Sequence, residues 1–361
     1  MNTMKQTVPL TAVGTEEASA RNPQAHTIMQ VEDLHISFEV GSGVMPSLFK
    51  RQPKQQLQAV RGISFSVQQG ETFSLVGESG CGKSTVARAL AGLYTPTKGT
   101  ISHAGHALTP GDTSPGRGIQ MIFQDPYASL NPRWRVERII AEPLRLQNRV
   151  GTTRQARSQV AALLRQVGLA ESDMFKFPHE FSGGQRQRIS IARALATQPD
   201  FLICDEPTSA LDVSVQAQVL NLMSDLQETL GLTYFFISHN MSVIAHISDR
   251  VGVMYLGRIV ELGPVDEIFH QPGHPYTRML LDAIPKIDQP NQARVAISGE
   301  MPSALSPPTG CAFHPRCPQA TDICRQTPPP VHAMSTRHHI ECHHPAASAR
   351  PSLQVITGET R

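Results

Sequence analysis

The stretch that decides the fold is GESGCGKST, at residues 77–85. It follows the apolar run TFSLV at residues 72–76. After it, apolar residues recur at helical spacing, at Val86, Ala89, Leu90 and Leu93. This order predicts a strand, a glycine-rich loop and a helix. The spacing also matches the phosphate-binding pattern G-x-x-x-x-G-K-[ST].

Residues 77–85, called the phosphate loop below, supply what a densely charged triphosphate needs. Glycines let backbone N–H groups turn inward as an anion nest, and the following helix adds the positive end of its dipole. We expect Lys83 to lie near the β- and γ-phosphates and Ser84 to bind Mg²⁺. The nucleotide contacts predicted in this loop are Gly77, Ser79, Gly80, Cys81, Gly82, Lys83, Ser84 and Thr85.

The composition is that of an ordinary globular chain of 361 residues, long enough for two or three compact units. No stretch approaches about 18 consecutive apolar residues, so we expect no transmembrane helix, and we see no secretory signal. The net charge of +2 gives no argument for binding nucleic acid or an anionic membrane surface. Six cysteines in a chain of this class favour a reduced, cytosolic protein.

The chain divides into an arm, a central α/β unit and an extension. Residues 1–26 are polar without an apolar period, and we expect a disordered arm. Residues 27–285 form the α/β unit, with an antiparallel β piece at its start and a helical insertion at about 125–195. Residues 286–361 are rich in proline, histidine and cysteine, and we interpret them as a C-terminal extension.

Polar residues follow the strands predicted in the α/β unit, for example at 201–205 and 233–238, between which a helix is expected at 213–230. Strands alternating with helices predict a mostly parallel sheet, in which ligands bind beyond the carboxyl ends of the strands. Besides the phosphate loop, the residues at these ends are Gln124, Asp205, Glu206 and His239.

These residue types suit phosphoryl transfer to water. Asp205 can hold Mg²⁺, and Glu206 is the best candidate to polarise the attacking water. Gln124 could contact Mg²⁺ or that water, and His239 could contact the γ-phosphate. Alone, Gln124 would be interpreted as a surface glutamine and His239 as a capping histidine. Together with the phosphate loop, they predict a catalytic set.

The motif FSGGQ at residues 181–185 is a second strong signal. Ser182 and the two glycines open a predicted helix, so they form a second anion-binding terminus. One chain needs only one such site for each γ-phosphate. We therefore expect this terminus to serve the nucleotide of a second subunit, with two chains meeting head to tail around ATP.

In combination and in order, these motifs resemble the ATP-binding subunits of ABC transporters, over residues 28–285. The motifs are GESGCGKST, Gln124, FSGGQ, FLICDEP at 201–207 and ISH at 237–239. The resemblance implies an α/β fold with a P-loop NTPase (RecA-like) core, an antiparallel β subdomain and a helical subdomain. It also implies hydrolysis of ATP with Mg²⁺.

The resemblance assigns further roles. Gln124 would face the permease. The residues that would contact nucleotide across a dimer are Ser182, Gly183, Gly184, Gln185 and Asp212. Phe38 would either stack on adenine or be a buried strand residue, and the sequence favours neither.

A finer resemblance points to the oligopeptide/dipeptide importer branch, which includes glutathione and nickel importers. It rests on PYASLNPR at 126–133, PHEFSGGQRQR at 178–188, VMYLGRIVE at 253–261 and HPYT at 274–277. Asn240 departs from the aspartate common in this branch, but it can still cap or hydrogen bond, so activity is expected to survive.

This branch implies a peripheral subunit on the cytoplasmic face of the inner (plasma) membrane. It would energise uptake of dipeptides, oligopeptides or a similar small solute such as glutathione. The implied partners are a second ATPase, a related chain rather than a self-copy, two integral-membrane permeases and an extracytoplasmic substrate-binding protein, but no nucleic acid. The solute itself is set by the partners, because specificity would lie in the binding protein and permeases.

Four cysteines of the extension, Cys311, Cys317, Cys324 and Cys342, are separated by five, six and seventeen residues. This differs from the paired C-x-x-C spacing of zinc fingers. Four thiolates could hold a 4Fe-4S cluster, and some importers of this branch are similar in this respect. Zinc and unliganded thiols are the alternatives. The neighbouring histidines are expected to be a solvated run rather than ligands: His338, His339, His343 and His344.

The alternative function is a soluble, non-transport ABC-type ATPase that acts on DNA or the ribosome. Against it, the chain has one ATPase unit, no coiled-coil insertion and no strongly basic face. The segment after Gln124 also resembles the importer branch instead.

Overall fold

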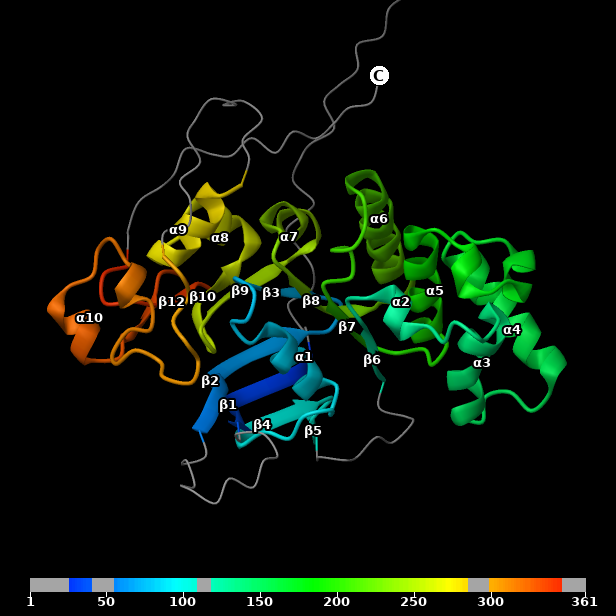
Figure 1. Cartoon of the computed structure of the whole chain (residues 1–361), viewed down its shortest axis with the longest axis horizontal. Helices are drawn as coiled ribbons and strands as arrows, with labels where there is room; N and C mark the ends of the chain where they lie inside the picture. Colours follow the sequence, from blue (N-terminus) through cyan, green and yellow to red (C-terminus); the bar gives the residue numbers. More distant parts are fainter. Residues whose placement is uncertain (1–25, 41–54, 109–117, 285–298, 346–361) are drawn as a thin grey trace, which may run out of the picture.

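The computed structural model describes residues 26–40, 55–108, 118–284 and 299–345, and the statements below concern these residues. The arm expected at 1–26 lies outside them, apart from His26. Figure 1 shows a large central sheet with helices on one side and a smaller sheet on the other. A group of helices lies at one end of the large sheet, and the C-terminal part of the chain lies at the other.

The large sheet is made of eight described strands. These are β3 (Thr72–Val76), β6 (Ile119–Ile122), β7 (Phe201–Asp205), β8 (Thr233–Ser238), β9 (Arg250–Tyr255), β10 (Arg258–Pro264), β11 (Val331–Ala333) and β12 (His339–Glu341). Their order is β11-β12-β10-β9-β3-β8-β7-β6. The strands from β9 to β6 run parallel, whereas β10, β12 and β11 pair antiparallel. The predicted α/β fold with a mostly parallel sheet is confirmed.

The smaller sheet is antiparallel and has the order β2-β1-β4-β5. Its strands are β1 (Thr27–Val40), β2 (Gln55–Gln68), β4 (Lys98–His103) and β5 (His106–Ala107). It packs on the large sheet through stacked rings, because Phe65 lies with its centroid 4.9 Å from Phe73 and 5.7 Å from Phe235. Helix α1 (Lys83–Leu90) buries Val86 and Leu90 in the same core. The antiparallel piece predicted ahead of the phosphate loop is therefore present.

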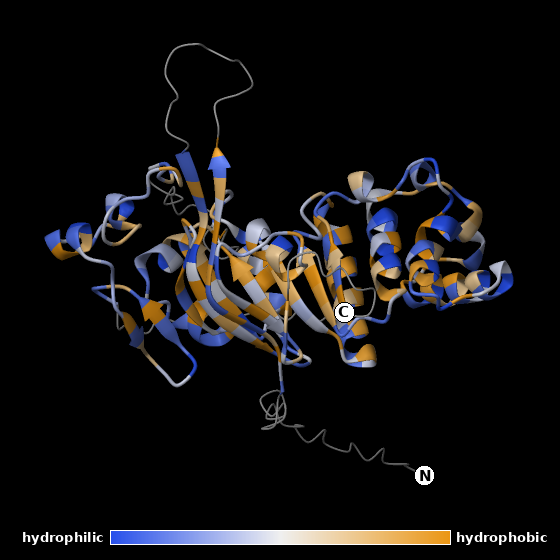
Figure 2. Ribbon diagram, turned by 90° about the horizontal axis from the view of Figure 1, so that it is seen from below, coloured by the Kyte–Doolittle hydropathy of each residue, from blue (hydrophilic) through white to orange (hydrophobic). Residues whose placement is uncertain are grey.

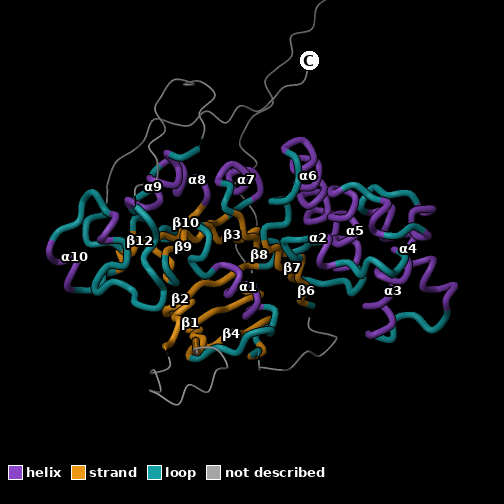
Figure 3. The backbone as a smooth tube through the Cα atoms, in the orientation of Figure 1, coloured by secondary structure: helices purple, strands orange, loops and turns teal. Residues whose placement is uncertain are grey.

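Helices form two groups around the sheet (Figures 1 and 3). The group beside the sheet contains α6 (Val213–Leu230), α7 (Met241–Ile247), α8 (Val265–His270) and α9 (Pro275–Asp282). The group at the end contains α2 (Pro126–Ser129), α3 (Val136–Leu146), α4 (Thr153–Gln166), α5 (Gly183–Leu195) and the 3-10 turns Glu171–Phe175 and Pro178–Glu180. Figure 2 shows the hydrophobic residues concentrated in the central strands and on inner helix faces. None of the helices in the described ranges has the length and hydropathy of a membrane span.

Residues 299–345, called the C-terminal region below, join the large sheet through β12. They also contain a 3-10 turn (His314–Arg316) and α10 (Asp322–Gln326). One sequence prediction was wrong here: His338 is not solvated but 2% exposed. Its Nε2 lies 2.8 Å from a carboxylate oxygen of buried Glu261, because β12 pairs with β10 and a buried carboxylate needs hydrogen-bond donors.

Candidate nucleotide site

Two glycines set the shape of the phosphate loop. Gly77 has φ +152°, and a Cβ there would lie 2.2 Å from the carbonyl oxygen of Met254. Gly82 has φ +114°, and a Cβ there would lie 2.4 Å from the carbonyl oxygen of Ala59. No larger residue fits either position, so the loop passes from β3 to α1 in close contact with β9 and β2.

Lys83 is the first residue of α1 and is only 5% exposed. Its Nζ donates to the carbonyl oxygens of Gly77 at 2.8 Å and Glu78 at 2.9 Å. The ammonium group therefore lies inside the loop and donates to two carbonyl oxygens, which phosphate oxygens can replace as acceptors.

Cys81 occupies the loop without facing the pocket, since its side chain is 1% exposed and belongs to the core. Burial raises the pKa of the Cys81 thiol, which keeps it protonated. Its backbone N–H donates to the carbonyl oxygen of Glu78 at 3.3 Å.

Ser84 and Asp205 meet at the base of the site. The Ser84 hydroxyl donates to Oδ1 of Asp205 at 3.0 Å. Burial raises the pKa of Asp205, while the hydrogen bond from Ser84 acts in the opposite direction. A hydroxyl and a carboxylate are oxygen ligands of the kind that Mg²⁺ takes, and a cation here would offset the cost of burying the charge. The pair therefore fits Mg²⁺.

Two predicted catalytic residues, Gln124 and His239, converge on one carboxylate oxygen of the third, Glu206. Oε2 of Glu206 accepts from Nε2 of Gln124 at 3.0 Å and lies 3.1 Å from Nδ1 of His239. These residues follow β6, β7 and β8, so parallel strands bring their ends together. The arrangement places a proton acceptor, an amide and an imidazole beside the phosphate loop.

A pocket of about 620 Å³ opens at this edge of the sheet. Of the predicted residues, those that line it are Phe38, Ser79, Gly80, Gly82, Lys83, Ser84, Thr85, Gln124, Glu206 and His239. Gly77, Cys81 and Asp205 do not line it. Sequence reasoning missed three lining residues, Leu57, Ala59 and Ala304. The first two could have been inferred from their strand beside the loop, but no local signal marks Ala304.

Phe38 lies near the end of β1, and its ring meets Tyr94 edge-on with centroids 5.2 Å apart. It is partly buried and lines the pocket rather than filling the interior of a sheet. Its position therefore suits contact with a planar ring, the first of the two interpretations of this residue.

The FSGGQ motif does not reach the pocket of its own chain. Ser182 caps α5, and its hydroxyl accepts from the N–H of Gln185 at 3.4 Å while the Gln185 amide oxygen accepts from the Ser182 N–H at 3.0 Å. A Cβ on Gly184 would lie 2.3 Å from Val215, so glycine lets α5 approach α6. Asp212 is exposed and caps α6 with no hydrogen bond from its side chain to that helix.

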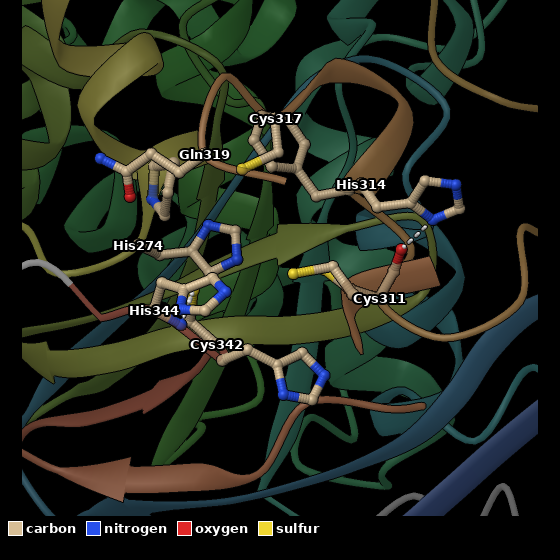
Figure 4. A pocket seen from close by; sticks show the side chains of 11 residues that line it. His274, Cys311, His314, Cys317, Gln319, Cys342 and His344 are labelled. Carbon is tan, nitrogen blue, oxygen red and sulfur yellow. Dashed lines mark hydrogen bonds between the residues drawn. The ribbon is translucent and has the colours of Figure 1, made fainter. Parts of the chain in front are cut away.

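The four cysteines of the C-terminal region line one small cavity, together with His274, His343 and His344. Figure 4 shows the sulfur atoms of Cys311 and Cys317 beside the His274 ring. Three of the thiols are buried and Cys317 is half-buried. Burial raises the pKa of Cys342 to about 11, so this thiol is neutral unless a cation lies near it. In the described ranges, no group of three or more His, Cys, Asp or Glu is placed to hold a metal ion.

Comparisons with known proteins agree with this geometry. The family model of the ABC transporter matches residues 60–209, and that of the oligopeptide/dipeptide transporter, C-terminal region, matches residues 260–324.

Curated relatives match over most of the chain. The chain is 48% identical to the di/tripeptide transport ATP-binding protein DppF of Pseudomonas aeruginosa, over 88% of this chain and 98% of that protein. It is also 48% identical to the oligopeptide transport ATP-binding proteins AppF of Bacillus subtilis (88% and 97%) and OppF of Escherichia coli (87% and 95%).

Two solved structures share the fold. The structure of cbiO1 from Clostridium perfringens, described as part of the ABC transporter complex cbiONQ, gives a TM-score of 0.56 at 27% identity. That match covers 67% of this chain and 90% of the other. A dimeric ATP-binding cassette bound to ADP and Pi gives a TM-score of 0.57 at 24% identity, over 66% of this chain and 99% of that one.

Proposed function

Because the chain belongs to the ATP-binding proteins of ABC transporters, with the C-terminal region of the oligopeptide/dipeptide branch, we propose that it energises uptake of dipeptides, oligopeptides or a similar small solute such as glutathione. The chain is an ATP-hydrolysing subunit of an ABC importer. The observation that carries the ATP hydrolysis is the convergence of Gln124 and His239 on Glu206 beside the phosphate loop, and the uptake of peptides is supported by the C-terminal region of the transporter family. The relatives named for peptide transport support this function over an ATPase of DNA or the ribosome.

ATP binds in the pocket that the phosphate loop lines, with adenine against Phe38. Lys83 exchanges the carbonyl oxygens of Gly77 and Glu78 for β- and γ-phosphate oxygens. Ser84 and Asp205 would hold Mg²⁺, with Gln124 as a further ligand if it leaves Glu206, and the ion would supply charge neutralisation of the phosphates.

Hydrolysis then depends on the side chains that converge on Glu206. The Glu206 carboxylate orients the attacking water and accepts its proton. His239 donates toward the γ-phosphate. Gln124 moves from the Glu206 carboxylate to the water or to Mg²⁺. The position of its side chain therefore differs between the empty and the nucleotide-bound site.

The residues 182–185 at the start of α5, of which Ser182 and Gln185 are exposed, complete the pocket of a second ATPase together with the exposed Asp212. This explains why they lie outside the pocket of their own chain. Two ATPases thus close head to tail around ATP, and by resemblance to this branch the second subunit is a related chain rather than a self-copy.

The permease partners dock on the helical group that follows Gln124. Large apolar side chains are exposed there, with Tyr127 65%, Leu146 69% and Phe175 47% exposed. Two integral-membrane permeases and an extracytoplasmic substrate-binding protein complete the importer. The chain accordingly works as a peripheral subunit on the cytoplasmic face of the inner membrane.

The four cysteines around the small cavity, Cys311, Cys317, Cys324 and Cys342, would hold a 4Fe-4S cluster. The residue types suit such a cluster, because four cysteine thiolates are its usual ligands and all four side chains border one space, but the four sulfur atoms do not surround a common metal position in this structure. The buried Cys342 thiol is neutral on its own, and bound iron would supply the positive charge that stabilises its thiolate. The cavity is small, so the side chains must turn outward to admit the cluster.

The test of the importer is an affinity purification of the tagged chain from detergent-solubilised membranes, followed by mass spectrometry. We expect two multi-span permeases and a second ATPase. Recovery of only soluble factors or nucleic acid would overturn the transport function. A Glu206→Gln variant, purified with ATP, should recover more of the second ATPase because the closed pair persists.

A further inference from the structure

We infer that Arg316 is a positioning residue for the phosphate loop, so that the C-terminal region forms part of the nucleotide site; this inference rests on the proposed ATPase function. Arg316 lies 238 residues away from Glu78, the second residue of the loop. Its Nη1 donates to both carboxylate oxygens of Glu78, at 3.0 and 3.2 Å.

This ion pair is not an ordinary surface pair. The Arg316 side chain is 3% exposed and that of Glu78 is 22% exposed. The guanidinium group also lies 5.7 Å from the centre of the Tyr255 ring. A charge-assisted bond with so little solvent access holds its geometry, whereas exposed pairs are screened and mobile.

The backbone of the same loop residue is held from the same side. The N–H of Glu78 donates to the hydroxyl of Tyr276 at 2.9 Å. Tyr276 is fully buried, and its ring packs on Phe313 of the C-terminal region with centroids 5.5 Å apart. Burial raises the pKa of Tyr276, so the group that accepts this bond is a neutral hydroxyl.

The C-terminal region also reaches the pocket itself. Ala304 lines the pocket, and its carbonyl oxygen accepts from the N–H of Gln58 at 3.3 Å. A Cβ built on Gly80 would lie 3.7 Å from the methyl carbon of Met301. Thus two segments of the region lie beside the site: residues 301–304, which reach the pocket and Gly80, and residues 313–316, which hold Tyr276 and Glu78.

The contacts of Arg316 and Tyr276 with Glu78 matter because Lys83 also holds the phosphate loop. Lys83 bonds the carbonyl oxygens of Gly77 and Glu78, so it stabilises the loop from inside. When Lys83 turns to phosphate oxygens, the loop loses these two bonds. Arg316 and Tyr276 then keep Glu78 in place, which preserves the anion nest at the moment of binding.

The experiment measures the ATP dissociation constant and the unfolding temperature of the full-length chain and its variants. Arg316→Gln should weaken ATP binding about tenfold, because a buried charge-assisted bond is lost. Arg316→Lys should restore part of the affinity. Glu78→Gln should match Arg316→Gln, and the double variant should be no weaker than either, since both remove the same contact.

The matched control is Arg325→Gln, which removes an arginine of the same region whose side chain is 62% exposed. It should leave ATP affinity unchanged. If Arg316→Gln only lowered the unfolding temperature and left affinity at the wild-type value, Arg316 would be structural and the inference would be overturned. Additive effects in the double variant would also overturn it. If the wild-type chain itself failed to bind ATP, the proposed function would fail instead.

Reciprocal coupling gives a second readout. If the region positions the loop, ATP must stabilise the contact in return. Amide hydrogen exchange of residues 314–317 should slow when ATP is added to the Glu206→Gln chain, and should not slow when Arg316→Gln is also present. Equal slowing in both would contradict the role of Arg316.

Discussion

At the scale of single residues, Glu206 has an unfavourable backbone conformation that hydrogen bonds hold in place. Its φ of +48° is uncommon for a residue with a Cβ. The backbone is nevertheless fixed on both sides, because its N–H donates to Ile237 at 3.0 Å and its carbonyl oxygen accepts from the Ser209 hydroxyl at 3.0 Å. The main chain therefore fixes the direction in which the side chain leaves the backbone, and Gln124 and His239 hold its carboxylate.

This arrangement predicts that Glu206→Gln removes the proton acceptor without moving the site. ATP binding should persist near the wild-type affinity, while the hydrolysis rate should fall by roughly 10²–10⁴-fold. ATP binding by equilibrium titration and phosphate release by the assembled importer would measure the two effects. Glu142→Gln, on the exposed side of α3, is the control. Normal hydrolysis by the Glu206 variant would show that another group accepts the proton.

At the scale of elements, the sequence pattern predicted those strands and helices whose apolar residues are close together in the chain. The predicted strands 201–205 and 233–238 and the helix 213–230 coincide with β7, β8 and α6, because buried apolar runs that end in polar residues are visible in sequence. The residues around the phosphates could also be predicted, since parallel strands bring their ends together.

Elements that depend on distant partners could not be predicted. The burial of His338 follows from Glu261, 77 residues earlier, and the reach of Ala304 to the pocket follows from how the C-terminal region folds back. The proline- and histidine-rich composition of this region does not indicate which distant residues it contacts. Sequence patterns therefore described the chain well up to β10 and poorly beyond it.

The cysteine cavity gives a prediction for the C-terminal region as an element. Cys311→Ser should lower the iron and acid-labile sulfide bound to anaerobically purified protein, because one of four ligands is lost. Cys204→Ala removes a buried thiol of β7, outside the cavity, and should leave the iron content unchanged. Metal analysis and visible absorption would measure both variants. Zinc in place of iron, or no metal in the wild-type chain, would contradict the cluster.

At the scale of the whole molecule, the nucleotide pocket lies between two ends with different surfaces. The helical group with its exposed apolar side chains lies at one end of the large sheet, and the C-terminal region lies at the other (Figure 1). The two ends therefore can contact different partners at the same time. Gln124 links the pocket to the first of them, since α2 begins two residues after it.

This separation predicts that Tyr127→Ser weakens attachment to the permeases while ATP binding by the isolated chain remains. The reason is that the Tyr127 ring is 65% exposed on the segment after Gln124. The amount of permease recovered with the tagged chain would measure the effect, and we expect a loss of several-fold, as for an aromatic contact at an interface. Ile323→Ser, which changes an apolar residue 50% exposed on α10, is the control. Equal permease recovery from the two variants would place the docking surface elsewhere.

The pairing of β12 with β10 limits where this chain can be divided. Removing the C-terminal region would uncover the edge of β10 and leave the Glu261 carboxylate without His338. An open strand edge invites other chains to pair with it, and Glu261 would keep only the backbone N–H groups of Gly273 and His274 as donors, so its buried charge would be less well compensated. Expression of the ATPase half alone should therefore give aggregated material, and chimaeras between importers should exchange this region together with the strand on which it lies.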